Sequence, residues 1–286
     1  MTTQATTTTR REVMVPRGAH HLYAEVRTGQ GTPIVLMHGF PDNLHLYDRL
    51  LPHLAHRPVV RFDFLGWGRS DKPAGYPYTH DNMTGDLAAV VDHLGLDRVV
   101  LVAHDASGPP AIDWALLNPH RVSALVLLNT VYHAMRGLRR PPAIALYSTP
   151  VVRTIARAVV RRREDLNRRL YYWQVGEFIR DPEQRAALVP TLYEQFRASQ
   201  PAFWRLNEDL LGTLWARRRR LADLHRFDRP VSVIFGARDR YLNPRVARQL
   251  AGAFPAADLH LLANAGHYVQ VDEPAAVASR LMQLGD

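Results

Sequence analysis

The sequence predicts an α/β fold, in which a mostly parallel central sheet carries helices on both faces. Short apolar runs bounded by Gly, Pro or Asp are typical of buried strands. The chain contains five of them, at residues 33–39, 58–64, 98–104, 123–129 and 230–236. Segments of helical length separate the runs, and this alternation indicates parallel strands joined by helices. The alternation stops after residue 130, which predicts a helical cap inserted between two strands of one sheet.

The boundaries of the predicted units follow from composition. The first ten residues, MTTQATTTTR, are polar and Thr-rich, so we predict a disordered lead-in over 1–10 rather than a secretory signal. The core is predicted over 11–130 and 230–286, and the cap over 131–229. No run of eighteen apolar residues exists, so we expect no membrane insertion, and we expect a cytoplasmic location.

One core helix is predicted in detail between the second and third strands. The segment DNMTGDLAAVVDHLG at 81–95 has apolar residues at helical spacing, namely Leu87, Val90, Val91 and Leu94. Gly95 ends this pattern in the manner of a C-terminal helix cap. The stripe predicts that one face of this helix packs on the sheet.

The basic residues concentrate in the predicted cap. The net charge is +9, and residues 131–230 hold twenty Arg against ten Asp plus Glu. The runs RRRED and ARRRR at 161–165 and 216–220 stand out. Such charge fits an acidic substrate, a nucleic-acid or membrane surface, or simply a solvated helical face. Because the chain has a single lysine, Lys72, arginine is its general basic residue, and we favour the solvated face and expect no nucleic-acid partner.

Three polar residues follow predicted strands in an order that suggests a catalytic site. Asp105 follows VVLVAH, Asp239 follows VIFGAR, and His267 lies in a loop after the apolar run LHLL. Ligands of parallel sheets bind beyond the carboxyl ends of the strands, so we expect these side chains to converge. The turn after the first predicted strand would aim the backbone N–H of Phe40 at the same point as that of Ala106. Two convergent N–H groups form an oxyanion hole.

Three motifs carry a resemblance to a known family. HGFP at 38–41, GWGRS at 66–70 and AHDASG at 103–108 resemble motifs of the α/β-hydrolases of the epoxide hydrolase and haloalkane dehalogenase group. The likeness runs from about residue 13 to the end and is weakest in the cap. The order of nucleophile, acid and histidine is that of the α/β-hydrolase triad. The resemblance implies the α/β-hydrolase fold with an aspartate nucleophile.

The resemblance also implies a mechanism. Asp105 attacks an electrophilic carbon and forms an alkyl ester, which water activated by His267 then hydrolyses while Asp239 orients the imidazole. The oxyanion hole of Phe40 and Ala106 acts in the second step. A serine esterase is disfavoured, because Ser107 lies two positions beyond the apex of the turn and is interpreted as a packing residue.

The cap residues bear on the leaving group. Epoxide hydrolases resemble one another in using two cap tyrosines as proton donors, and Tyr172 in YYWQ matches the first best, with Tyr171 as the alternative. The segment FWRLN at 203–207 offers no tyrosine where the second is expected. The substitutes considered for that second donor are Tyr193 and Tyr147. Simple packing of these rings is an open alternative.

Haloalkane dehalogenases resemble one another in holding the departing halide with N–H donors. The usual Trp after the nucleophile is Ala106 here, and the usual Asn after HG is Phe40. Trp173 or Trp204 remains as a possible indole donor. Fluoroacetate dehalogenases would place an Arg where Ala106 stands.

These observations together predict an epoxide hydrolase that forms a diol from a small, mainly apolar organic substrate. The alternatives are a haloalkane or haloacid dehalogenase with the same two steps, and a non-hydrolytic cyclase or ligand-binding member of the fold. The chain has no cysteine, no metal-ligand cluster and no phosphate loop, so we expect no cofactor and no metal. The sequence leaves the oligomeric state open.

Overall fold

The computed structural model describes residues 9–208 and 210–284, and one eight-stranded sheet forms its centre. The strand order is β1-β2-β4-β3-β5-β6-β7-β8. The strands are β1 Arg10–Arg17, β2 His20–Arg27, β3 Ile34–Met37, β4 Val59–Phe62, β5 Val99–Asp105, β6 Val122–Thr130, β7 Val231–Gly236 and β8 Ala257–Leu262. β2 pairs antiparallel with β1 and β4, and the other pairs are parallel. The predicted fold class is therefore confirmed.

The five predicted strands are β3 to β7, which form the buried centre of the sheet. All of the side chains of β3, β4 and β7 are buried. Of the three additional strands, β1 and β8 are the edge strands and β2 is the next strand in from β1. All three have exposed or partly exposed positions, and β8 has no buried position at all. A strand with such positions lacks the continuous apolar run that marks a central parallel strand, and for that reason the sequence pattern did not predict these three.

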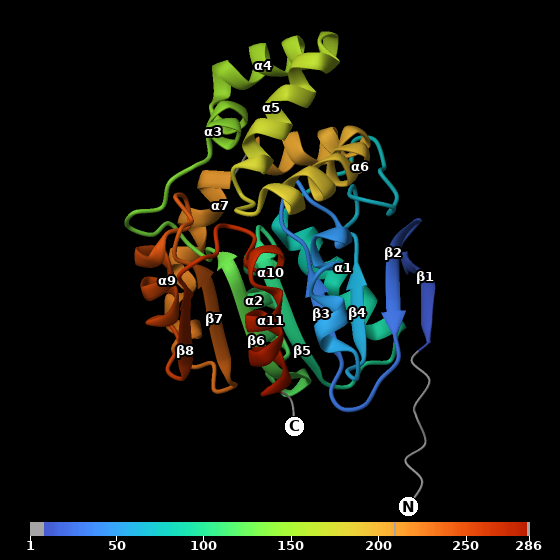
Figure 1. Cartoon of the computed structure of the whole chain (residues 1–286), viewed down its shortest axis with the longest axis vertical. Coiled ribbons are helices and arrows are strands. Elements are labelled where there is room, and N and C mark those ends of the chain that lie inside the picture. The colour runs from blue at the N-terminus through green and yellow to red at the C-terminus, as the bar shows by residue number, and fades with distance from the viewer. Residues whose placement is uncertain (1–8, 209, 285–286) are drawn as a thin grey trace, which may run out of the picture.

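Helices pack on both faces of the sheet (Figure 1). Those of the core are α1 His80–His93, α2 Gly108–Leu117, α9 Pro244–Ala251, α10 Val269–Asp272 and α11 Pro274–Met282, with 3₁₀ turns at Leu44–Tyr47, Leu51–Leu54 and Pro119–Arg121. α1 is the helix predicted at 81–95. Its N-cap, Thr79, accepts the N–H of Asn82, and Gly95 follows its end with φ 61°. A positive φ is the conformation that glycine adopts most readily, so Gly95 terminates the helix.

A helical insertion separates β6 from β7. It contains α3 Pro142–Ser148, α4 Pro150–Arg162, α5 Glu164–Gly176, α6 Pro182–Glu208, α7 Leu210–Ala216, a 3₁₀ turn at Arg217–Arg220 and α8 Leu221–Leu224. Figure 1 shows α3 to α6 stacked above the end of the sheet toward which β6 points. The insertion thus covers the carboxyl ends of the parallel strands, where ligands of such sheets bind.

Part of the Arg-rich character of the insertion serves to anchor it. Arg217 is buried, and its guanidinium donates to Asp113 Oδ2 on α2 at 2.7 Å. Arg220 donates to the other oxygen of the same carboxylate at 2.6 Å. The hydroxyl of Tyr132 also donates to Asp113, at 2.8 Å. The run at 216–220 is therefore not a wholly solvated face, because two of its arginines hold the insertion against the core.

The first strand begins inside the segment predicted as a disordered lead-in. Residues 1–8 of that segment lie outside the described residues, whereas Arg10 already pairs with Arg27 in the first ladder. The predicted boundary at residue 10 is corrected accordingly. Within the described part of the chain, no single helix has the length and apolar character of a membrane span. The helices α3 and α4 pass that test only as a pair bent by 108°.

Candidate active site

Asp105 stands at a sharp turn where β5 ends and α2 is about to begin. Its φ is 50°, a left-handed conformation that costs a non-glycine residue on the order of 1–3 kcal/mol. Ser107 helps to hold the turn, because its buried hydroxyl accepts the N–H of His104 at 2.9 Å and lies 2.9 Å from the carbonyl of Met37 on β3. Ser107 therefore ties the turn to the neighbouring strand, and its oxygen is not free to act as a nucleophile.

The loop after β3 presents its backbone to the same carboxylate. The N–H of Phe40 donates to Asp105 Oδ2 at 3.1 Å, and the N–H of Ala106 also hydrogen-bonds this side chain. A Cβ on Gly39 would lie 2.6 Å from the Cβ of Asp105, so only glycine allows this close approach. His38 is buried, and its Nδ1 lies 2.8 Å from the carbonyl of Gly39, so it supports the loop.

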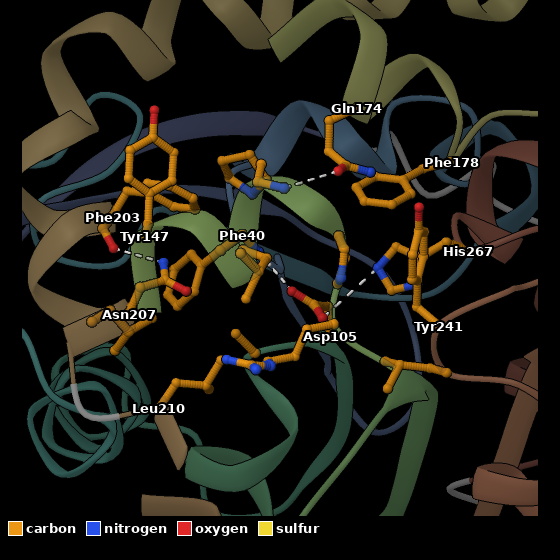
Figure 2. Close-up of a pocket in the computed structure, with 18 of the residues that line it drawn as sticks. Phe40, Asp105, Tyr147, Gln174, Phe178, Phe203, Asn207, Leu210, Tyr241 and His267 are labelled. Atoms are coloured by element: carbon orange, nitrogen blue, oxygen red, sulfur yellow. Dashed lines mark hydrogen bonds and ion pairs between the residues drawn. The ribbon is translucent and has the colours of Figure 1, made fainter. Parts of the chain in front are cut away.

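His267 lies between two carboxylates. Its Nδ1 is 2.7 Å from Asp239 Oδ2, and its Nε2 is 3.8 Å from Asp105 Oδ1. Figure 2 shows the imidazole beside Asp105 at one end of a cavity. The structure thus brings together Asp105, Asp239 and His267 in the arrangement of a nucleophile, a base and an orienting acid.

The carboxylate of Asp239 accepts hydrogen bonds from four donors, of which only His267 was predicted from the sequence. Oδ1 accepts the N–H groups of Tyr241 and Leu242 at 2.8 and 3.1 Å, and Oδ2 accepts Asn129 Nδ2 at 2.7 Å in addition to His267. Asn129 was missed as a site residue. The available signal was a polar residue at the carboxyl end of the run SALVLLN, the same position that singled out Asp105.

The charges of the three groups reinforce one another. Burial alone would lower the pKa of His267, but the carboxylates of Asp239 and Asp105 raise it to about 9. Burial raises the pKa of Asp105, and the nearby imidazolium with the Phe40 and Ala106 N–H groups opposes that rise. The pKa of Asp239 is lowered, because His267 and its other donors outweigh the effect of burial. The two carboxylates therefore stabilise the protonated form of His267.

A cavity opens between this triad and the insertion. Asp105, Ala106 and His267 lie at its core end, and its walls are mainly apolar. The apolar lining includes Phe40, Phe178, Phe196, Phe203, Leu210 and Leu214. Such a chamber suits a small organic molecule of low polarity.

Two of the six predicted cap residues reach this cavity. Tyr171 is buried, lines the wall and donates its hydroxyl to the carbonyl of Pro41 at 3.0 Å. Tyr147 also lines the cavity, and burial raises its pKa to about 12. Figure 2 shows the hydroxyl of Tyr147 turned away from Asp105. Tyr171 is thus the phenol that the structure places in the wall beside the HGFP loop.

The other four predicted cap residues lie outside the cavity lining. Tyr172 and Trp173 are 38% and 51% exposed, because α5 presents the next residues of its helical turn outward. The hydroxyl of Tyr193 donates to Glu164 at 3.0 Å. Trp204 is buried against Arg157 and Arg161 instead. The preference for Tyr172 over Tyr171 is therefore corrected by the rotation of α5.

The same helix face carries lining residues that sequence reasoning missed. Asn167 and Gln174 line the cavity from α5 beside the predicted Tyr171, and Phe178 lines it just after the helix ends. Asn167, Tyr171 and Gln174 recur at intervals of four and three residues, which places them on one side of α5. The spacing is visible in the sequence, but only the structure shows that this face of the helix points into the cavity.

Comparison with known proteins agrees with the fold. A model of the alpha/beta hydrolase fold family matches residues 32–274. The chain belongs to this family. Haloalkane dehalogenase 2 of Mycobacterium tuberculosis is 29% identical to this α/β-hydrolase over 279 residues, which cover 93% of this chain and 91% of that protein.

Two further relatives span similar lengths. The haloalkane dehalogenase of Mycolicibacterium paratuberculosis is 30% identical over 268 residues, covering 88% of this chain and 83% of its own. The solved structure of epoxide hydrolase CorEH without ligand superimposes with a TM-score of 0.73 at 22% identity, covering 96% of this α/β-hydrolase and 98% of that chain. The last match concerns the fold alone.

Proposed function

We propose that this α/β-hydrolase opens epoxides to diols through a covalent ester on Asp105. The observation that supports it is the setting of the Asp105 carboxylate. One oxygen, Oδ2, receives the Phe40 N–H, and the other, Oδ1, faces the imidazole of His267 at 3.8 Å. A carboxylate held in this way is suited to attack an sp³ carbon and then to be released by water.

In the first step, Oδ1 of Asp105 attacks one carbon of the epoxide. The new O–C bond forms as the carbon–oxygen bond of the ring breaks, and the electron pair moves to the ring oxygen. That oxygen needs a proton, because an alkoxide is a poor leaving group. Tyr171 is the cap phenol best placed to supply it, provided that its hydroxyl exchanges the Pro41 carbonyl for the substrate.

In the second step, His267 acts as a base on water. Alkylation removes the negative charge of Asp105, which is one of the groups that raise the pKa of His267 to about 9. The pKa of the imidazole therefore falls once the ester forms, and the neutral base becomes available when it is needed. Water adds to the ester carbonyl, and the charge on Oδ2 is stabilised by the N–H groups of Phe40 and Ala106. Collapse of this intermediate releases the diol and restores Asp105. The proton that His267 takes from water replaces, through solvent, the proton that Tyr171 gave to the ring oxygen, so both residues return to their starting states.

Dehalogenation is the second candidate function. Relatives that are 29–30% identical over most of the chain carry the name haloalkane dehalogenase. Phe203 lines the cavity near the place where a second phenol was expected. A halide leaves without a proton, so the same nucleophile and base would serve with hydrogen-bond donors alone around the leaving atom. A ligand-binding or cyclase role is the third candidate and requires no turnover at Asp105.

The test is a screen of purified protein against epoxides and alkyl halides, in which diol and free halide are measured separately. His267→Gln serves as a trap for the covalent intermediate, which mass spectrometry locates on the peptide that contains Asp105. Diol formation together with an adduct supports the proposal. Free halide with an adduct supports the second candidate, and the lack of any adduct with all substrates contradicts both.

A further inference from the structure

The amide of Gln174 has a defined orientation in the cavity wall. Its side chain lies on α5, one turn after Tyr171, and is only 4% exposed. Oε1 accepts the backbone N–H of Ala143 at 3.3 Å. Since a backbone N–H only donates, the atom that faces it must be the amide oxygen, and the position of Nε2 is thereby determined.

The nitrogen of this amide has no hydrogen-bond partner. Gln174 Nε2 is buried and unpaired, although it carries two N–H donors. Buried polar groups in native proteins are almost always paired, so a persistent exception calls for a partner supplied from outside. Gln174 lines the cavity, whose walls are mainly apolar. A polar atom of a bound molecule is the partner that this setting provides for.

Two other donors near the triad are already engaged, whereas Asn167 Nδ2, one turn before Tyr171 on α5, is buried and unpaired like Gln174 Nε2. The hydroxyl of Tyr171 donates to Pro41, and the N–H of Phe40 donates to Asp105. Figure 2 shows Gln174 on the cap side of the cavity and Asp105 on the opposite side, with His267 next to the gap between them. A substrate carbon seated over Asp105 would direct its leaving atom toward the cap, because displacement proceeds in line with the attacking oxygen.

We propose that Gln174 Nε2 donates a hydrogen bond to the atom that leaves the carbon attacked by Asp105. This inference rests on the proposed function and extends it to the leaving group. As the bond from Asp105 Oδ1 to carbon forms, the bond to the leaving atom breaks and that atom takes the electron pair. The amide keeps its proton and stabilises the negative charge. Tyr171 transfers a proton where the atom is an epoxide oxygen, whereas a halide needs only the amide.

Tyr171 and Gln174 then form a pair of donors on one helix face. They are three residues apart on α5, so their side chains lie on the same side of the helix. One donor can transfer its proton and the other cannot. This pair would replace the two phenols of epoxide hydrolases, one of which is missing where Phe203 lines the cavity.

The test is the single-turnover rate at which Asp105 is alkylated in Gln174→Met. Methionine keeps the length of the side chain and removes both N–H donors. We expect alkylation to slow by roughly 10- to 100-fold for an epoxide and for an alkyl halide alike, since a hydrogen bond to a developing anion is lost. Hydrolysis of the preformed ester should keep its rate. Gln195→Met is the matched control, because Gln195 lies on α6 and does not line the cavity.

Two outcomes would overturn the inference. An unchanged alkylation rate in Gln174→Met would show that the amide does not contact the leaving atom. A rise in KM at an unchanged alkylation rate would assign the amide to substrate binding away from the reacting carbon. Gln174→Leu provides the same measurement if the Met variant does not fold. If the unmodified protein is never alkylated at Asp105 by any substrate, the proposed function fails instead, which separates the two failures.

Discussion

The two walls of the cavity differ in how completely their polar groups are paired. On the core side, both oxygens of Asp239 are satisfied by four donors, and Asn129 bridges this carboxylate to the N–H of Gly236. On the cap side, the amide nitrogens of Gln174 and Asn167 are buried without a partner. The acid of the triad is fully paired before any substrate arrives, whereas the cap side leaves donors to be satisfied by one.

This difference assigns separate tasks to the two walls. The fully paired carboxylate of Asp239 resists reorganisation, so the base that it orients keeps its geometry through both chemical steps. Unpaired donors in an apolar wall favour a ligand that brings acceptors of its own. Changes on the core side should therefore affect any substrate, and changes on the cap side should depend on the leaving group.

The largest expected effect is that of Asp105→Asn. The amide occupies the same space but is a far weaker nucleophile, so turnover should fall by about 10⁴-fold or more with every substrate. Steady-state assays measure this loss, and thermal unfolding of the variant serves as the control for an intact fold. Activity near that of the unmodified protein would place the nucleophile elsewhere.

His267→Gln should separate the two chemical steps. Attack by the Asp105 carboxylate needs no base, whereas hydrolysis of the ester does, so turnover should fall by about 10²–10⁴-fold after a burst of one equivalent. Intact-protein mass spectrometry should show a covalent adduct that persists. Accumulation of free enzyme rather than adduct would contradict this order of events.

Tyr171→Phe should act on only one class of leaving group. Without the phenol, alkylation by an epoxide should slow by about 10²–10⁴-fold, while alkylation by an alkyl halide should change little. The measurement is the single-turnover alkylation rate with both substrate types. Tyr172→Phe is the matched control, because its ring lies on the exposed side of α5 and is 38% exposed. Equal loss with both substrates would mean that Tyr171 only supports the wall.

The smallest expected effect is a shift in the titration of His267. The carboxylate of Asp105 is one of the charges that raise the pKa of this imidazole to about 9. Asp105→Asn removes that charge, as esterification does, so the pKa of His267 should fall. NMR titration of the ring resonances measures the change. A pKa that stays the same or rises would contradict the proposal that alkylation releases the base.

The raised pKa of His267 also makes the stability of the folded protein depend on pH. A histidine with a raised pKa stabilises the fold at low pH, whereas a carboxylate with a lowered pKa stabilises it at high pH. His267 has a pKa raised above the ordinary histidine value of about 6.5, so the folded state binds its proton more tightly than the unfolded state does. The stabilisation is complete below pH 6.5 and is lost as the pH rises through about 9. Thermal unfolding across this range should show a smaller loss in Asp105→Asn.

The sequence by itself determined the fold class, the five central strands and the residues at their ends. Buried parallel strands need continuous apolar runs, and polar residues at their carboxyl ends meet at one edge. This reasoning predicted Asp105, Asp239 and His267 as site residues, together with Phe40 and Ala106, and the structure brings these groups together. The small residues around Asp105 predicted that it lies at the apex of a tight turn, since larger side chains do not fit in such a turn.

Only the tertiary structure decided which cap side chains face the nucleophile. The sequence of a helical segment such as YYWQ does not tell which of its residues face the cavity, because it does not give the rotation of the helix about its axis. Neighbouring residues on a helix point in directions about 100° apart. Tyr171 and Gln174 face the cavity while Tyr172 and Trp173 face outward, because α5 packs on α6 and on the HGFP loop. That Gln174 Nε2 lacks a hydrogen-bond partner likewise follows from tertiary packing and could not be predicted from residue spacing.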